Sequence, residues 1–466
     1  MRSDEVLRLH SFKAKVSQDG THHAASSRDS AILQPSTSRP RRQPLVLTES
    51  RPVANACFGW ALAVGDFNND KTSDLAVSAP CTLENRAERV FIFYGRQTLQ
   101  RTPNVTLSTR EAGIGFGFAL AASDWTRDGR TDLAVGAPEA SNSEESLLDG
   151  RVIIYRGASN FGANSTTVRS PLPPDPDFLI GGRFGEPLAS GDVDGDGTSD
   201  LIVGAWLMDT VVVLYGGNTI GSRRTILRGG IVGEQFGFAV AAGDINKDGF
   251  ADILIGAPFG GPNGAGVVYI FLGGKSLSGR PNVMLPNPHP PANPEVADPT
   301  FASSLAVADI NGDGYADAIV GSPNTSEGDP TESRPGRVYI YFGGPTLNSA
   351  PDLILQELDP QATSAFGYAL AVGDLNGDGT ADLAVSAIGA TVGNRQRAGR
   401  VYLFYGGPAI GPNPNFILEP PSPEAGAEFG TAMAIGDLNR DGKPDLAVGA
   451  PGASRRAGQV FLYLGR

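Results

Sequence analysis

The sequence predicts an all-β protein, a seven-bladed β-propeller built from four-stranded antiparallel blades. A short acidic cassette occurs seven times, with starts spaced 52 to 68 residues apart. A period of that size indicates one supersecondary unit per repeat. Each cassette lies between two short β-prone segments, and the 466 residues include 61 Gly and 35 Pro. This composition is typical of many short strands separated by turns.

Each repeat contains the same parts in the same order. It begins with Phe-Gly in six repeats and with Phe301-Ala302 in the fifth. A small-residue strand, the acidic cassette and a second strand ending in Gly-Ala-Pro or a variant follow. A third strand such as Val267–Leu272 is strongly β-prone, and a shorter fourth strand such as Val283–Leu285 ends the repeat. We expect each Phe to pack between blades rather than to form a platform for sugars. Four antiparallel strands in each of seven repeats predict seven blades.

The last repeat lacks a fourth strand, because the sequence ends after its third strand. An unassigned Leu-Val-Leu segment at 45–47 precedes the first Phe-Gly and matches the fourth strands elsewhere. We expect this N-terminal strand to complete the last blade, which closes the ring and leaves no exposed inter-blade edge. Residues 44–466 are therefore predicted to form the propeller. Residues 1–43 are polar, show no signal-peptide pattern, and are predicted to be a disordered tail.

The seven acidic loops are predicted to bind Ca²⁺. Oxygen-bearing side chains occupy positions 1, 3, 5 and 9 of each nine-residue loop, and glycine occupies position 6 in all but the first. Ca²⁺ takes six to eight oxygen ligands, and glycine permits the sharp turn. The loops span 66–74, 124–132, 192–200, 244–252, 309–317, 374–382 and 437–445. The predicted ligands are Asp66, Asn68, Asp70, Asp74, Asp124, Thr126, Asp128, Asp132, Asp192, Asp194, Asp196, Asp200, Asp244, Asn246, Asp248, Asp252, Asp309, Asn311, Asp313, Asp317, Asp374, Asn376, Asp378, Asp382, Asp437, Asn439, Asp441 and Asp445.

The alternative interpretation is that these loops are simply good hairpin turns. Turns need one or two such residues, whereas each loop has four at fixed spacing. The loops also contain 22 of the 50 acidic residues, so one rim of the ring repels itself without cations. We expect up to seven Ca²⁺ ions in a structural role. The first two loops fit least well, because Lys71 replaces the glycine and Thr126 is a weaker ligand than a carboxylate.

The joint pattern of Phe-Gly, acidic loop and Gly-Ala-Pro resembles the FG-GAP repeat of integrin α-subunit N-terminal propellers, across residues 44–466. The resemblance implies Ca²⁺ between the first and second strands and a ligand on the opposite face. It implies an extracellular or cell-surface adhesion or protein-binding module. We do not expect an enzyme, because the only histidine outside the tail is His289 and the sequence has no Gly-x-Ser-x-Gly motif. Two alternatives remain open: a lectin-type propeller that binds glycans, and an accessory domain of a secreted polysaccharide-degrading enzyme.

Several single features complete the prediction. The net charge of −13 argues against nucleic acid as a partner, and no apolar run is long enough to span a membrane. Cys57 and Cys81 flank the first hairpin closely enough to form a disulfide, against the alternative of two free thiols. Trp206 replaces a Pro of Gly-Ala-Pro and is either an exposed anchor or a space-filling residue. The loops Pro286–Thr300 and Pro323–Gly336 are the longest expected on the ligand face.

Overall fold

The computed structural model describes residues 43–81, 88–109, 111, 114–140, 149–172, 182–290, 300–324, 336–361 and 363–465. The chain divides into two units, Met1–Arg41 and Arg42–Arg466. The predicted tail, residues 1–43, lies outside the described residues except for its last residue. No helix in the described ranges is long and apolar enough to cross a membrane.

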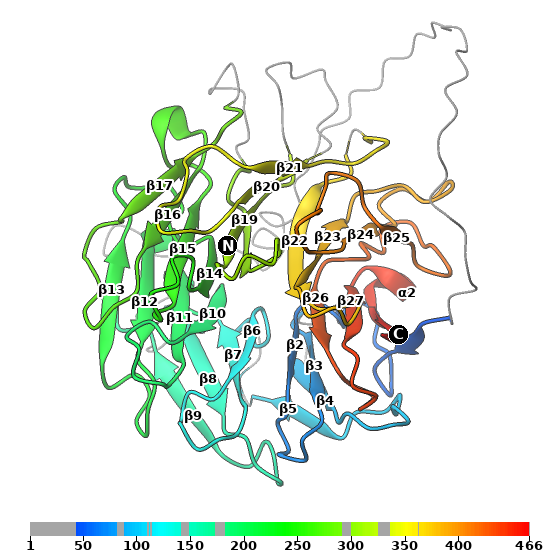
Figure 1. Ribbon diagram of the computed structural model, residues 1–466. Helices are drawn as coiled ribbons and strands as arrows, with labels where there is room; N and C mark the ends of the chain where they lie inside the picture. Colours follow the sequence, from blue (N-terminus) through cyan, green and yellow to red (C-terminus); the bar gives the residue numbers. More distant parts are fainter. Residues whose placement is uncertain are drawn as a thin grey trace, which may run out of the picture. The chain divides into compact units, whose positions relative to one another are not determined.

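Seven antiparallel sheets of four strands each form a ring, so the chain is a seven-bladed β-propeller (Figure 1). In six blades the four strands follow one another in the sequence. The first three blades consist of β2 (Leu62–Gly65), β3 (Asp74–Ala79), β4 (Arg89–Phe93) and β5 (Val105–Ser108); β6 (Leu120–Ser123), β7 (Asp132–Ala137), β8 (Arg151–Tyr155) and β9 (Ser165–Arg169); and β10 (Leu188–Gly191), β11 (Asp200–Ala205), β12 (Thr210–Leu214) and β13 (Arg224–Arg228).

The next three blades repeat this order. They consist of β14 (Ala239–Gly243), β15 (Asp252–Ala257), β16 (Val267–Phe271) and β17 (Val283–Pro286); β18 (Ser304–Ala308), β19 (Asp317–Ser322), β20 (Arg337–Tyr341) and β21 (Leu353–Leu355); and β22 (Phe366–Gly373), β23 (Asp382–Ala387), β24 (Arg400–Phe404) and β25 (Phe416–Leu418). The short helices η1 (Trp206–Met208), η2 (Pro262–Gly264) and α2 (Ala453–Arg456) lie between second and third strands.

The seventh blade is closed by the N-terminal strand, as predicted. It consists of β26 (Met433–Gly436), β27 (Asp445–Ala450), β28 (Gln459–Tyr463) and β1 (Leu45–Leu47). Strand β1 pairs antiparallel with β28, with Leu45 opposite Leu462 and Leu47 opposite Val460. The two ends of the propeller are therefore held together by one sheet.

The strands differ in burial according to their place in the blade. The second strand of every blade is buried along its whole length, because neighbouring blades cover both of its faces. The first strands of neighbouring blades pack against one another around the axis. Their small residues suit this crowding: a Cβ added at Gly191 would lie 2.8 Å from the Cβ of Ala251 in the next blade.

The Phe-Gly pairs are wedges between blades. The Phe side chain of every repeat is completely buried, including Phe301. Phe236, for example, packs on Tyr269 with ring centroids 5.4 Å apart. Gly237 follows with φ of +95°, and an added Cβ would lie 2.9 Å from the carbonyl oxygen of Thr210 in the preceding blade. The predicted packing role is confirmed, and these rings are not available to stack on a sugar.

The first blade carries a disulfide between Cys57 and Cys81, whose Cα atoms are 5.6 Å apart. The hairpin register that pairs Leu62 with Val77 brings these two positions together. The disulfide alternative is therefore confirmed over that of two free thiols. It joins the chain just before β2 to the chain just after β3.

Candidate metal centres

Each acidic loop is the hairpin that joins the first and second strands of a blade. In the fourth blade, Gly243 at the end of β14 pairs with Asp252 at the start of β15. The other six blades have the equivalent pair. All seven loops therefore lie at the same end of their blades, on one face of the ring.

Position 1 of the loop organises the turn. In the fourth loop, Asp244 accepts hydrogen bonds from the backbone N–H of Asp248 (3.0 Å) and of Gly249 (2.8 Å), one on each carboxylate oxygen. The same two bonds, from positions 5 and 6, recur in the other six loops. This carboxylate therefore holds the loop in one shape.

Position 5 fixes the exit from the turn, because its Oδ1 accepts the N–H of position 7 in all seven loops. Positions 4 and 6 both have positive φ. Position 6 is the glycine that the sequence indicated, or Lys71 at +69° in the first loop. Position 4 was not recognised from the sequence, since Asn69, Arg127, Lys247 and Arg440 take the left-handed conformation there without being glycine.

Position 9 connects the loop to the rest of the blade. Asp252 is fully buried. One of its carboxylate oxygens accepts the backbone N–H of Ile245 at 3.0 Å. The other accepts the N–H of Gly273, which lies just beyond the third strand, at 2.8 Å. The bond from the residue beyond the third strand recurs in all seven blades. Burial raises the pKa of Asp252 to about 6 and that of Asp74 to about 7. Every blade therefore keeps a desolvated carboxylate directly behind its loop.

Position 3 differs between loops. In the fourth, fifth and sixth loops it is Asn, whose Nδ2 donates to the position 5 carboxylate at 2.9 Å. Its Oδ1 accepts the N–H of position 5 in the same loops. In the seventh loop, Asn439 Nδ2 donates instead to Asp445, at 3.3 Å. The amide thus places a partial positive charge among the carboxylates.

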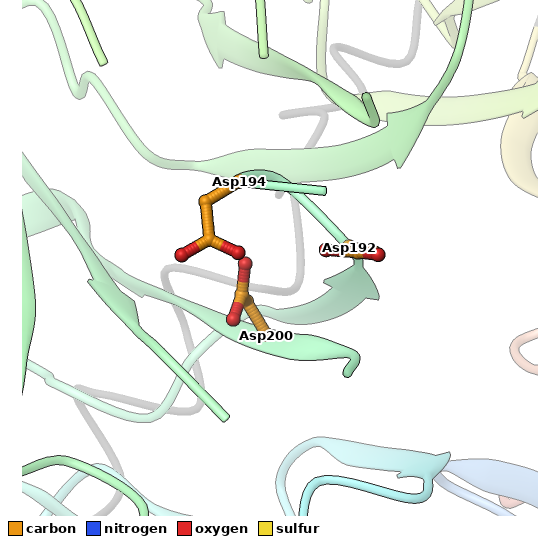
Figure 2. A group of neighbouring side chains, drawn as sticks. All are labelled: Asp192, Asp194 and Asp200. Carbon is orange, nitrogen blue, oxygen red and sulfur yellow. The ribbon is translucent and has the colours of Figure 1, made fainter. Parts of the chain in front are cut away.

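The third loop has Asp194 at position 3 and is the most acidic. Asp192, Asp194 and Asp200 each bring one carboxylate oxygen to within 4.8 Å of the others (Figure 2). Arg223, from the segment before β13, donates from Nη2 to Asp194 Oδ2. Its guanidinium also lies 3.8 Å from the ring centroid of Tyr215. A cationic side chain therefore balances the loop that has four carboxylates. The sequence offered one signal for this ion pair. The blade whose loop has Asp at position 3 also has an arginine, Arg223, just before its fourth strand.

The donor atoms of the loops fit a hard divalent cation. All candidate side-chain ligands are oxygens of Asp, Asn or Thr, which suit Ca²⁺ and not a soft metal. In the first loop, Asn68 Oδ1 is buried and has no hydrogen-bond partner. A buried oxygen without a donor is costly, and a cation bound there would satisfy it. The first loop also keeps the common hydrogen bonds although Lys71 replaces the glycine.

On the face opposite the loops, Arg183 lies at the junction of the second and third blades and is 3% exposed. Its Nε donates to Glu186 Oε2 at 2.9 Å and its Nη1 to Glu139 Oε1 at 3.3 Å. Its guanidinium also lies over the rings of Phe118 and Trp206, at 5.4 and 5.8 Å. Trp206 is 5% exposed, so it fills space and the exposed-anchor alternative is wrong.

Buried glutamates hold other junctions on this face. Glu88 accepts the N–H groups of Gly115 and Phe116 in the next blade. Tyr402 donates its hydroxyl hydrogen to Glu357 at 2.8 Å. Burial raises the pKa of both carboxyl groups. The two long loops predicted to form the ligand surface lie largely outside the described residues, at 291–299 and 325–335.

A family model described as FG-GAP repeat matches residues 58–80, 236–271, 301–341, 366–404 and 429–463. Integrin alpha-IIb of Mus musculus is 40% identical over 164 residues, covering 34% of this chain and 15% of the relative. Integrin alpha-PS5 of Drosophila melanogaster is 26% identical over 386 residues, covering 76% of this chain and 36% of the relative. Phosphatidylinositol-glycan-specific phospholipase D of Rattus norvegicus is 35% identical over 182 residues, covering 37% of this chain and 21% of the relative. The matched part is thus well under half the length of each relative.

Proposed function

Because the chain is an FG-GAP repeat β-propeller similar to those of integrin α-subunits, we propose that it is a non-catalytic adhesion or protein-binding module stabilised by Ca²⁺. The observation that carries the proposal is the repetition of one loop geometry seven times. In every copy, oxygen-bearing side chains at positions 1, 3, 5 and 9 surround the same turn. A hairpin turn alone does not require four such side chains at fixed positions in every copy.

Residues at positions 1, 3, 5 and 9 of each loop would hold the ion, giving up to seven sites. Bound Ca²⁺ would supply the positive charge that offsets the desolvated position 9 carboxylates and the repulsion between neighbouring loops. Extracellular modules bind Ca²⁺ with dissociation constants of about 10⁻⁴–10⁻³ M. At ten times such a constant, each site stabilises the fold by about 1.4 kcal/mol. Seven small contributions therefore make calcium a condition of stability rather than a switch.

Two further features support an extracellular or cell-surface location. The disulfide between Cys57 and Cys81 is of the kind that persists in oxidising compartments. Integrin names also recur among the similar proteins. We propose that residues 44–466 form one such domain and that it presents a ligand surface opposite the acidic loops. The aromatic rings that repeat from blade to blade, those of the Phe-Gly and Phe-Ala pairs, are completely buried, which does not favour a lectin-type propeller.

Removal of the metal tests the calcium part of the proposal. We expect excess chelator to lower the melting temperature by about 10 °C, since roughly 10 kcal/mol is lost over a domain of this size. Added Ca²⁺ should restore the melting temperature, whereas the same concentration of Na⁺ should not. An unchanged melt in excess chelator would overturn the calcium assignment.

A further inference from the structure

A groove lies between the third and fourth blades and contains no residue of the acidic loops. The third blade and the connection after it contribute Arg228 and Ile231. The fourth blade contributes Tyr269, Arg280 and Met284. Glycines and prolines at 229, 230, 261, 262, 279 and 281 form the remaining walls. Of the five larger side chains, four are exposed, whereas Tyr269 is buried, with 5% of its surface exposed.

Apolar surface is concentrated at this part of the ring. Ile231 is 57% exposed and Met284 is 47% exposed, and the adjacent Val232 is 91% exposed. The described residues include ten exposed large hydrophobic side chains, and six belong to the third and fourth blades or their connection: Leu207, Ile226, Ile231, Val232, Phe259 and Met284. Single exposed hydrophobic residues need no explanation, but a concentration of them marks an interaction surface.

The groove is also basic in a protein of net charge −13. Arg228 and Arg280 are exposed and have no acidic partner among the residues that the structure describes. By contrast, Arg89, Arg183 and Arg400 each pair with a glutamate. Guanidinium groups recognise carboxylates with directional, charge-assisted hydrogen bonds. Two such groups on one apolar groove therefore favour an anionic ligand with apolar side chains.

Tyr269 gives the groove a polar floor. Its hydroxyl donates to Glu234 Oε2 at 2.8 Å, and Glu234 is 1% exposed. With its hydrogen committed, the hydroxyl oxygen can only accept a bond, for example from a peptide N–H. Gly230 keeps this floor open: a Cβ added there would find its nearest atom, Tyr269 Oη, at 4.0 Å. A side chain at 230 can thus fill the groove without a clash in the backbone.

We propose that this groove binds an extended acidic segment of a partner protein. Carboxylates of the segment pair with Arg228 and Arg280, and an apolar side chain of the segment lies on Ile231 and Met284. An acidic polysaccharide would satisfy the arginines but would not use the exposed aliphatic surface, so a peptide fits better. The inference rests on the proposed role as a binding module and assigns that role a partner class and a site.

An array of octapeptides tests the proposal, with two glutamates at every spacing and leucine or phenylalanine between them. The full chain is used in saturating Ca²⁺, and binding is measured by fluorescence anisotropy for the best peptides. We expect dissociation constants of about 10–100 μM and at least a tenfold loss in Arg228→Glu and in Arg280→Glu. Arg224→Glu is the matched control, because Arg224 is an exposed arginine on the same strand outside the groove. Gly230→Trp should abolish binding with the melting temperature unchanged.

Three results would overturn the inference: no peptide binding below 1 mM, equal affinity in all variants, or binding of oligogalacturonate in place of the peptides. Peptides with serine in place of the apolar residues should bind at least tenfold more weakly. Failure of the calcium proposal would be seen separately, as a melt that does not respond to chelator.

Discussion

On the face that carries the acidic loops, every blade repeats the same hydrogen bonds, whereas on the opposite face several junctions between blades rest on ion pairs that differ from one junction to the next. Position 1 of each loop accepts the N–H groups of positions 5 and 6, and position 9 ties each loop to its third strand. Opposite, Arg183 joins Glu139 and Glu186, and Arg397 joins Glu428 at 2.6 Å. The repeated hydrogen bonds therefore fix the shape of each single blade, while the ion pairs on the opposite face distinguish one junction between blades from another.

Loss of a position 9 carboxylate should lower the free energy of unfolding more than any other change considered below. Asp252→Ala leaves the buried N–H group of Ile245 and the half-buried N–H group of Gly273 without an acceptor, which should cost about 3 kcal/mol or more. Asp248→Ala is the matched control, since Asp248 is exposed in the same loop, and it should cost less than about 1 kcal/mol. Urea unfolding in chelator measures both. Equal losses would mean that the buried carboxylate does not hold the blade.

A buried glutamate on the opposite face, Glu357, should make the stability of the protein depend on pH. Burial raises the pKa of Glu357 in the fold. Its contribution to stability is therefore present at low pH and is lost as pH rises through that raised value. Glu357→Gln lacks this titration, so its melting temperature relative to the parent should increase between pH 4.5 and pH 8.5. A difference that is constant over this range would contradict the assignment.

Relief of backbone strain in the first loop should change the free energy of unfolding by a smaller amount. Lys71 has φ of +69°, where six other loops have glycine. Lys71→Gly should therefore stabilise the protein by about 1 kcal/mol. The reverse change, Gly249→Lys, should destabilise by a similar amount, because φ there is +89° and an added Cβ meets no atom within 4 Å. If both changes lower stability in urea unfolding, strain is not the difference between the loops.

The smallest effect concerns the cation that the third loop supplies for itself. Arg223→Ala should lower stability in chelator by about 0.5 kcal/mol, because the arginine is more than half exposed. The gain in melting temperature on adding Ca²⁺ should be larger than in the parent, since Asp194 no longer shares its charge with a guanidinium. Arg224→Ala, at the neighbouring exposed position, should change neither quantity. Identical responses of the two variants would contradict competition at this loop.

The structural features that repeat along the chain could be predicted from the sequence. Six Phe-Gly pairs, one Phe-Ala pair and seven loops predicted the ring, and the unpaired Leu-Val-Leu segment predicted its closure by β1. The hairpin around Asp70 was enough to place Cys57 near Cys81. Each of these features depends only on neighbours within one blade or on the number of copies of a pattern.

The remaining features depend on contacts between distant parts of the chain. Arg183 meets Glu139 and Phe118 from the preceding blade, and nothing in its local sequence marks this. The left-handed conformation of Lys247 and Arg440 is imposed by the hydrogen bonds of the loop, not by residue type. The groove between the third and fourth blades combines residues that are more than fifty positions apart, such as Arg228 and Met284.

The central claim, that the seven acidic loops are calcium sites, is tested most directly by counting bound ions. Equilibrium dialysis against about 5 mM Ca²⁺, well above the expected constants, should give several ions per chain and at most one per loop. Asp374→Ala with Asp378→Ala should lower the count by one and leave the buried Asp382 in place. Zero bound ions, or the same count in the double variant as in the parent, would contradict the account.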